Sequence, residues 1–452
     1  MQQSPDSGIS VLVVGGGLAG LSTAIESYRK GHQVRVVDRR PNFNDFGDLI
    51  GIGPSALRTP EKWPGFLERV RAQSYTPMNW MFKYDNTLLC KVPTGQPDYP
   101  SLLISRADLH RQLYAYATEL QIPIEFGKFV EEYHESDEQA FATTSDGETL
   151  EADVIIAADG VGSRSWKLVM GKKDQPISSG FAVYRVNFPI GPALKNPLIA
   201  AEFADVDDRV SVHIGPDAHV VIGKKKDHIN WMMTYKDDGN ADESWTKTAQ
   251  ADKALKHVAG WTPFLTELIK ATPNNTVIDW KLMWRNPQPQ WTSPKARVIQ
   301  VGDSAHSFLP SSGSGATMAW EDAFSIAACL QLGGKENIPL ATRVHNLLRF
   351  ERVSCAQKMG YKTRELWHKT DWEAVSKNPN SVGNTIGNWV LRHNPEQYAR
   401  EKYEDASNSI LTGAPFKNTN AVPGYTYKPW DIHQLIEASE RGEKVQDEGD
   451  WS

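Results

Sequence analysis

Residues 9–38, ISVLVVGGGLAGLSTAIESYRKGHQVRVVD, decide how we expect the rest of the chain to fold. Residues 9–14 are apolar and mostly β-branched, which is typical of a strand buried on both faces. Residues 18–30 have the pattern of a helix closed by Gly31, and residues 33–38 predict the next strand. The stretch therefore predicts a βαβ unit whose first turn consists of glycines.

This first turn carries the pattern G-x-G-x-x-G at Gly15, Gly17 and Gly20. Glycines permit the sharp turn and let a pyrophosphate approach bare backbone amides, while the helix N-terminus supplies positive potential. Asp38 ends the second strand, where a carboxylate accepts hydrogen bonds from a ribose. The pattern predicts a dinucleotide site and leaves NAD, NADP and FAD as alternatives. The structural alternative is that small residues only let the helix pack on the strand.

The composition excludes several classes of protein. The 452 residues, 40% hydrophobic and 23% charged, fit roughly two to three globular domains, and the net charge of −6 does not suggest a nucleic acid as partner. Cys90, Cys329 and Cys355 are far apart, and we expect no metal site because no cluster has metal-ligand spacing. We also expect no signal peptide and no membrane span, and therefore a cytoplasmic protein.

Downstream residues continue the alternation of strands and helices. Residues 139–150 predict a hairpin around Asp146-Gly147, and residues 180–235 predict successive antiparallel strands. Residues 47–53, GDLIGIG, are expected to form a flexible, closely packed loop. Ser105 is expected to cap a helix. We expect helices at residues 105–120, 244–258, 263–270, 317–332 and 340–370, and buried strands at residues 152–158 and 296–301.

Three of the predicted strands end in a polar or glycine-rich turn. These turns are GGGLAG at residues 15–20, DGVGS at residues 159–163 and GDSAH at residues 302–306. Because the carboxyl ends of parallel strands meet at one edge of a sheet, the turns are expected to lie together at a cofactor site.

The three turns, together with Arg106 and residues 302–323, GDSAHSFLPSSGSGATMAWEDA, resemble the FAD-dependent aromatic hydroxylases. These are single-component, group A flavoprotein monooxygenases that include salicylate hydroxylase and many fungal biosynthetic enzymes. The resemblance covers about residues 1–370. It implies FAD as cofactor, NADPH or NADH as transient reductant, and O2 that adds to flavin C4a to give a hydroperoxide. The protein would contribute positioning and the exclusion of water.

The resemblance also implies residue roles. Asp38 would hold the adenosine ribose, Arg106 the pyrophosphate region and Asp303 the ribityl chain. The isoalloxazine would lie at a helix N-terminus, which stabilises the negative charge of reduced flavin. The residues expected to bind the cofactor are Gly15, Gly17, Gly20, Asp38, Arg39, Gly47, Arg106, Asp159, Gly160, Gly302, Asp303, Gly313, Gly315 and Ala316, with Asp159-Gly160 also expected to contact NADPH.

The sequence departs from the family pattern at three places. Trp166 stands where an arginine usually follows the DG motif, which bears on NADPH handling. Ser314 stands where glutamine is frequent. Gly223-Lys224 lies near the place where many phenol hydroxylases have Tyr-Pro, so we expect no phenol-binding tyrosine there.

Arg185 and Asp48 are the candidate catalytic residues. Arg185 alternates with apolar residues on a predicted strand, so it needs either a substrate anion or an acid of the protein as partner. Asp48 stands where the family more often has a small apolar residue. It is expected to act as an acid or base or to pair with Arg185, and the alternative is a surface acid.

We expect an α/β fold with a Rossmann-like FAD-binding domain, an inserted antiparallel β-sheet substrate domain and a helical C-terminal region. The FAD-binding domain would comprise residues 1–75, 101–175 and 285–370, the substrate domain residues 76–100 and 176–284, and the C-terminal region residues 371–452.

The expected function is an FAD-dependent monooxygenase that hydroxylates or epoxidises an aromatic or polycyclic small molecule in secondary metabolism. One alternative is a flavin-dependent dehydrogenase or oxidase without oxygen insertion. Another is a non-catalytic binding protein on a flavoprotein scaffold. The substrate and the oligomeric state stay open.

Overall fold

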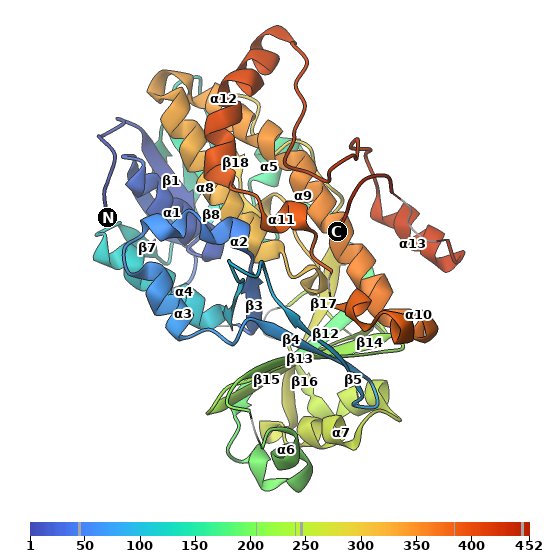
Figure 1. Ribbon diagram of the computed structural model, residues 1–452. Coiled ribbons are helices and arrows are strands. Elements are labelled where there is room, and N and C mark those ends of the chain that lie inside the picture. Colours follow the sequence, from blue (N-terminus) through green and yellow to red (C-terminus); the bar gives the residue numbers. More distant parts are fainter. Residues whose placement is uncertain (44–46, 205, 240, 245–246, 384, 444–446) are drawn as a thin grey trace.

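A parallel sheet of five strands forms the centre of the larger half of the molecule (Figure 1). The computed structural model describes residues 1–452 except 44–46, 205, 240, 245–246, 384 and 444–446. The strand order β18-β11-β1-β2-β7 confirms the predicted Rossmann-like arrangement. The strands are β1 Ser10–Val14, β2 Gln33–Asp38, β7 Ile124–Phe126, β11 Val154–Ala157 and β18 Val298–Gln300.

The two faces of this sheet are covered differently. Val11 and Val13 pack into a core shared with the helices, whereas Leu12 and Val14 face a three-stranded antiparallel sheet. The helices are α1 Leu18–Arg29, α4 Arg106–Glu119, α8 Gly315–Gly333 and α9 Ile338–His368. The covering sheet contains β8 Val130–Glu135, β9 Ala140–Thr144 and β10 Thr149–Ala152, so the predicted hairpin is confirmed.

The second half is an eight-stranded sheet that is antiparallel except where β13 pairs with β4, and it confirms the predicted inserted sheet (Figure 1). Helices α6 Pro197–Glu202 and α7 Pro263–Lys270 contribute to the core on its outer face. In spatial order its strands are β16 Thr248–Gln250, β17 Thr276–Trp284, β12 Ile177–Pro189, β15 His228–Lys236, β14 Ala218–Lys224, β13 Arg209–Gly215, β4 Met78–Lys83 and β5 Leu88–Pro93.

The predicted helix at residues 244–258 is wrong. Residues 248–250 form strand β16, a 3-10 helix covers Ala251–Val258, and residues 245–246 lie outside the described residues. Strand β17, which pairs with β16, was also not predicted from the sequence. Backbone pairing with a neighbouring strand outweighs the weak local preference for helix.

Two smaller expectations also need correction. Residues 47–53 were expected to form a closely packed loop, but they contain a strand, because β3 Leu49–Ile52 pairs with β6 Leu102–Ser105. Helix α4 begins as predicted, but the Ser105 side chain makes no capping bond. Instead, the Arg106 backbone N–H donates to the Asp48 carbonyl at 2.7 Å, which fixes the start of β3 to the start of α4.

The remaining helices are short or lie in the C-terminal region, which also contains extended segments (Figure 1). The membership of β4 and β5 in the large sheet supports the proposed assignment of residues 76–100 to the substrate domain. Within the described residues, no helix is long and apolar enough to cross a membrane. The helices are α2 Pro54–Leu57, α3 Phe66–Ala72, α5 Trp166–Met170, α10 Trp372–Lys377, α11 Asn388–Leu391, α12 Pro395–Thr412 and α13 Ile432–Glu440.

A fully buried ionic cluster joins α8 to α9. Arg349 Nε donates to Asp322 at 2.9 Å, and its Nη1 donates to Glu321. Arg352 holds the same glutamate through two nitrogens, each at 2.8 Å. Burial alone would raise the pKa of Asp322, but His306 and Arg349 outweigh it and lower the pKa to about 2. The cluster is therefore ionised and tightly paired.

We expect Arg349→Met to lower the free energy of unfolding by about 3–5 kcal/mol, because Glu321 and Asp322 stay buried with less compensating charge. Denaturant unfolding measures this effect. Arg343→Met, which removes an exposed arginine from the same helix, is the matched control and should cost less than about 0.5 kcal/mol. Equal unfolding midpoints for the two variants would contradict the expectation.

Candidate active site

The three predicted turns meet at one edge of the parallel sheet, as the sequence predicts. A Cβ atom built on Gly15 would lie 2.3 Å from the Ala158 carbonyl oxygen, and one on Gly302 would lie 2.9 Å from the Ala19 Cβ. The Ser304 hydroxyl accepts from the Gly160 N–H at 2.8 Å. These contacts place the ends of β1, β11 and β18 side by side.

The glycines of the first turn differ in what surrounds them. A Cβ on Gly20 would lie 1.8 Å from the Gly15 carbonyl oxygen, so no side chain fits between α1 and the turn. A Cβ on Gly17 would meet no atom within 4 Å. Gly20 is therefore required for packing, whereas Gly17 keeps the outer side of the turn open to a ligand.

Asp38 lies beside this turn. Its carboxylate accepts from the Gly16 N–H at 2.7 Å and from Arg40 Nε at 2.9 Å. Burial alone would raise the pKa of Asp38, but the bonds to Arg40 and Gly16 lower it. Arg39 is exposed, and its role stays a prediction; Arg40 is the arginine that reaches the turn.

Two residues that contact the glycine turn after β1 were not predicted from the sequence. Arg40 follows Asp38 by two positions in the bend after β2, and its backbone N–H donates to Asp38 Oδ1 at 2.8 Å, which brings its side chain back to Asp38. His110 Nε2 donates to the Gly16 carbonyl at 2.6 Å. It follows Arg106 by four positions, so the helical period places both on one face of α4.

The other expected cofactor residues lie around the same edge. Asp303 is exposed in a recess, where the surrounding protein raises the pKa of its carboxyl while His306 and Arg106 oppose the shift. Asp159 accepts from the Tyr133 hydroxyl at 2.8 Å. Gly47 packs against Arg106, since a Cβ there would lie 2.8 Å from its Cδ.

The N-terminus of α8 completes this edge. Gly313 has φ of +59°, which favours glycine, and Gly315 begins the helix. Ala316 follows in the first turn, where backbone N–H groups have no partner within the helix. The 19-residue helix therefore offers amides to a negatively charged group.

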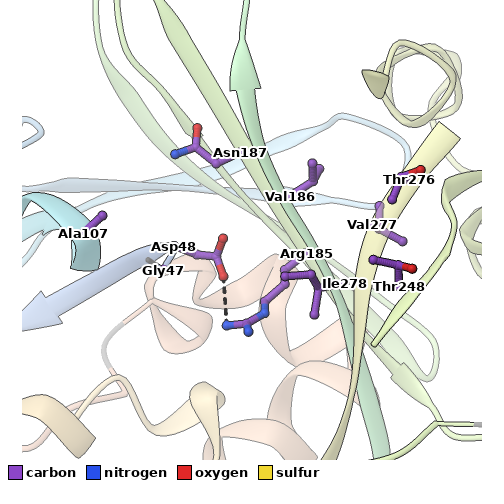
Figure 2. Close-up of a pocket in the computed structure, with 10 residues that line it drawn as sticks. All are labelled: Gly47, Asp48, Ala107, Arg185, Val186, Asn187, Thr248, Thr276, Val277 and Ile278. Atoms are coloured by element: carbon purple, nitrogen blue, oxygen red, sulfur yellow. Dashed lines mark hydrogen bonds and ion pairs between the residues drawn. The ribbon is translucent and has the colours of Figure 1, made fainter. Parts of the chain in front are cut away.

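A cavity of about 320 Å³ lies between the start of α4 and the edge of the large sheet. Arg185 extends from β12 toward Asp48, and its Nη1 donates to Asp48 Oδ2 at 3.2 Å (Figure 2). Both side chains are nearly buried, with exposed fractions of 7% and 9%. The cavity is lined by Gly47, Asp48, Ala107, Arg185, Val186, Asn187, Thr248, Thr276, Val277 and Ile278.

Burial governs the electrostatics of this ion pair. It raises the pKa of Asp48, and the positive charges of Arg185 and Arg106 oppose only part of that shift. It also lowers the pKa of Arg185 against the effect of Asp48. The alternative that Asp48 is a surface acid is wrong, and the expected pairing with Arg185 is confirmed.

The structure gives a steric reason for the missing tyrosine at Gly223. A Cβ at this position would lie 2.7 Å from Asn230 Nδ2 and 3.1 Å from the Tyr75 hydroxyl. Asn230 Nδ2 itself donates to that hydroxyl at 3.0 Å. A side chain at Gly223 would therefore clash with a buried pair that already brings a tyrosine to this place from another segment.

Comparison with known proteins identifies the family. The FAD binding domain family matches residues 8–336. Over 475 residues the chain is 36% identical to the FAD-dependent monooxygenase mdpD of Emericella nidulans, with 99% of this chain and 91% of that protein covered. The chain belongs to the FAD-dependent monooxygenases. The FAD-dependent monooxygenase dmxR9 of a Cryptosporiopsis species is also 36% identical over 472 residues, with 100% and 91% covered.

Solved structures give the same assignment for this monooxygenase. FqzB superposes with a TM-score of 0.84 at 30% identity, covering 93% of this chain and 99% of that one. CtdE in complex with FAD and substrate 4 gives 0.83 at 29% identity, covering 89% and 100%. These matches favour an enzyme over the non-catalytic alternative.

The edge described above fits FAD. The open space over Gly17, the exposed Asp303 carboxylate and the amides at the start of α8 offer the groups that a pyrophosphate, a ribityl chain and an isoalloxazine require. Apart from Arg39, the proposed cofactor residues of this monooxygenase therefore lie around one edge of the parallel sheet, although they come from distant parts of the chain.

We expect Gly17→Ala and Gly20→Ala to affect the monooxygenase differently. Gly17→Ala should leave the melting temperature of the apoprotein unchanged and raise the FAD dissociation constant by about tenfold or more, because the methyl group points to the phosphate side of the turn. Gly20→Ala should lower the melting temperature itself, because the methyl group clashes with the Gly15 carbonyl. Thermal unfolding and FAD titration measure both effects, and unchanged FAD affinity in Gly17→Ala would contradict the assignment.

Proposed function

We propose that this monooxygenase uses NADPH or NADH and O2 to hydroxylate or epoxidise an aromatic or polycyclic small molecule in secondary metabolism. The observation that carries the proposal is the buried Arg185–Asp48 pair in a cavity beside the FAD-binding edge. Gly47 lines the same cavity and packs on Arg106, so the two sites share a wall.

The lining of the cavity supports the proposed substrate class. Ala107 and Ile278 offer apolar surface to a flat ring system, whereas the side chains of Val186 and Val277 belong to the core on the outer face of the large sheet. Asn187, Thr248 and Thr276 offer hydrogen-bonding groups, which suit oxygen substituents on such a ring (Figure 2). A volume of about 320 Å³ lies at the small end of the usual range for small-molecule sites.

We assign separate roles to the two charged residues. Arg185 orients the substrate by donating hydrogen bonds to an oxygen substituent, and Asp48 fixes the guanidinium while able to accept or return a proton. FAD, when bound, would supply the redox chemistry: two electrons from the reduced nicotinamide would reduce O2, so that one oxygen atom enters the substrate and the other leaves as water. The protein keeps water away from the reacting atoms.

The proposal is tested with purified protein, NADPH or NADH, and a panel of hydroxylated naphthalenes and anthraquinones. We expect a yellow protein whose NAD(P)H oxidation accelerates with at least one compound, and a product that carries one atom from ¹⁸O2. Mass spectrometry measures the incorporation. An oxidised product without ¹⁸O would instead favour the flavin-dependent dehydrogenase or oxidase.

We expect Arg185→Ala and Asp48→Asn to retain FAD but to lower coupled product formation by about 10²-fold, because neither residue belongs to the proposed cofactor edge. Product formed per NADPH consumed and the flavin absorbance measure the two effects. Arg209→Gln is the matched control, because Arg209 is also a buried arginine of the large sheet, paired with Glu202 at 2.5 Å outside the cavity. Normal coupled turnover in Arg185→Ala would remove it from the mechanism.

A further inference from the structure

An aromatic side chain supports Arg185 in addition to Asp48. The guanidinium carbon of Arg185 lies 4.9 Å from the centroid of the Trp280 ring. Arg185 on β12 is paired with Ile278 on β17, and Trp280 stands two residues further along the same strand. Side chains two residues apart on a strand share a face, so Trp280 is the diagonal neighbour of Arg185.

Trp280 also borders a second, smaller cavity of about 50 Å³. Asp303 and Pro310 line this cavity from the FAD-binding side, and Arg285, which directly follows β17, lines it from the large sheet. Arg185 lines the larger cavity. The stacked indole and guanidinium groups therefore lie between the substrate cavity and the recess that contains the proposed ribityl ligand.

We propose that Trp280 is the positioning residue for Arg185: its ring holds the guanidinium against Asp48 in the orientation that productive oxygen transfer requires. The inference rests on the proposed function of Arg185 and extends it to a residue outside the charged pair. Trp280 acts through Arg185 and needs no contact with the substrate.

The physical need for such support follows from the burial of Arg185. The Arg185 side chain, at 7% exposure, has lost most of its water, and a flexible side chain can rotate away from the carboxylate that it faces. The negative face of an indole attracts a cation, and a planar guanidinium stacks on it. The ring and the carboxylate together leave Arg185 with few competing orientations.

The acid limb of the pH profile should report this support. Asp48 is faced by Arg185 from β12 and by Arg106 from α4, and both favour its ionised form. If Trp280 no longer holds Arg185 in place, the carboxylate loses part of this stabilisation and its pKa rises further. Activity that requires the ion pair is then lost at a higher pH.

The test compares Trp280→Leu, which removes the ring, with Trp280→Phe, which keeps an aromatic face. The matched control is Trp284→Leu, because Trp284 lies on the same strand and the same face but packs against Trp430 at 5.8 Å. All variants are assayed as FAD-loaded enzyme with 1,5-dihydroxynaphthalene, or with another panel compound that the wild type oxygenates. Rates are expressed per bound FAD.

We expect Trp280→Leu to lower kcat and the product formed per NADPH by about threefold to tenfold, while KM changes less than twofold. The O2 that is consumed without forming product should be recovered as hydrogen peroxide. Its acid limb should move up by about half a pH unit. Trp280→Phe should keep most of the wild-type coupling and most of the wild-type pH profile. Trp284→Leu should show neither the loss of coupling nor the shift of the acid limb.

Unchanged coupling and pH profile in Trp280→Leu, with the wild type active, would overturn the role of Trp280 and leave the proposed function intact. Equal losses in Trp284→Leu would show that Trp280 is only structural. If the wild type itself makes no oxygenated product, the proposed function fails. FAD affinity, measured in parallel, separates these outcomes from loss of the cofactor.

Discussion

Asp322 is the residue through which the cofactor edge depends on the helical core. Its Oδ2 accepts from the Gly302 N–H at 3.0 Å and lies 2.5 Å from His306 Nε2. Its other oxygen is held by Arg349. A buried carboxylate that has lost its water requires all of these partners. The turn that carries Asp303 is thus fixed to α8, whose N-terminus forms the far end of the same edge.

The proposed substrate cavity is held together differently from the cofactor edge, because its two charged residues, Asp48 and Arg185, belong to different halves of the molecule. Asp48 is fixed by its carbonyl, which accepts from the Arg106 N–H, and by the pairing of β3 with β6. Arg185 comes from the inserted sheet. The ion pair therefore spans the junction between the sheet and the FAD-binding half, so that the cavity beside it exists only when both halves are in place.

The sequence predicts the cofactor edge well because its constraints are local. Gly20 must lack a side chain because its Cβ atom would clash with the Gly15 carbonyl in the turn before α1, and Gly147 ends a three-residue hairpin loop with φ of +84°. The burial of Asp48 follows from contact with a residue 137 positions away, which no local pattern encodes. The role of Trp280 was not predicted for the same reason: the residues of β17 are typical of a strand, but its pairing with β12, which brings Trp280 to Arg185, is not local.

The two buried ion pairs, Arg352–Glu321 and Arg185–Asp48, differ in how fully their hydrogen-bonding groups are used, and this difference indicates their roles. Arg352 meets Glu321 through two bonds of 2.8 Å and also donates to three backbone carbonyls, so its hydrogen-bonding capacity is used within the core. Arg185 meets Asp48 through Nη1 at 3.2 Å beside a cavity of about 320 Å³. Burial moves the pKa of Asp48 up and that of Arg185 down, toward the neutral forms. A pair held in this state, next to space for a ring system, contributes little to stability and is arranged to exchange a hydrogen bond or a proton with what enters.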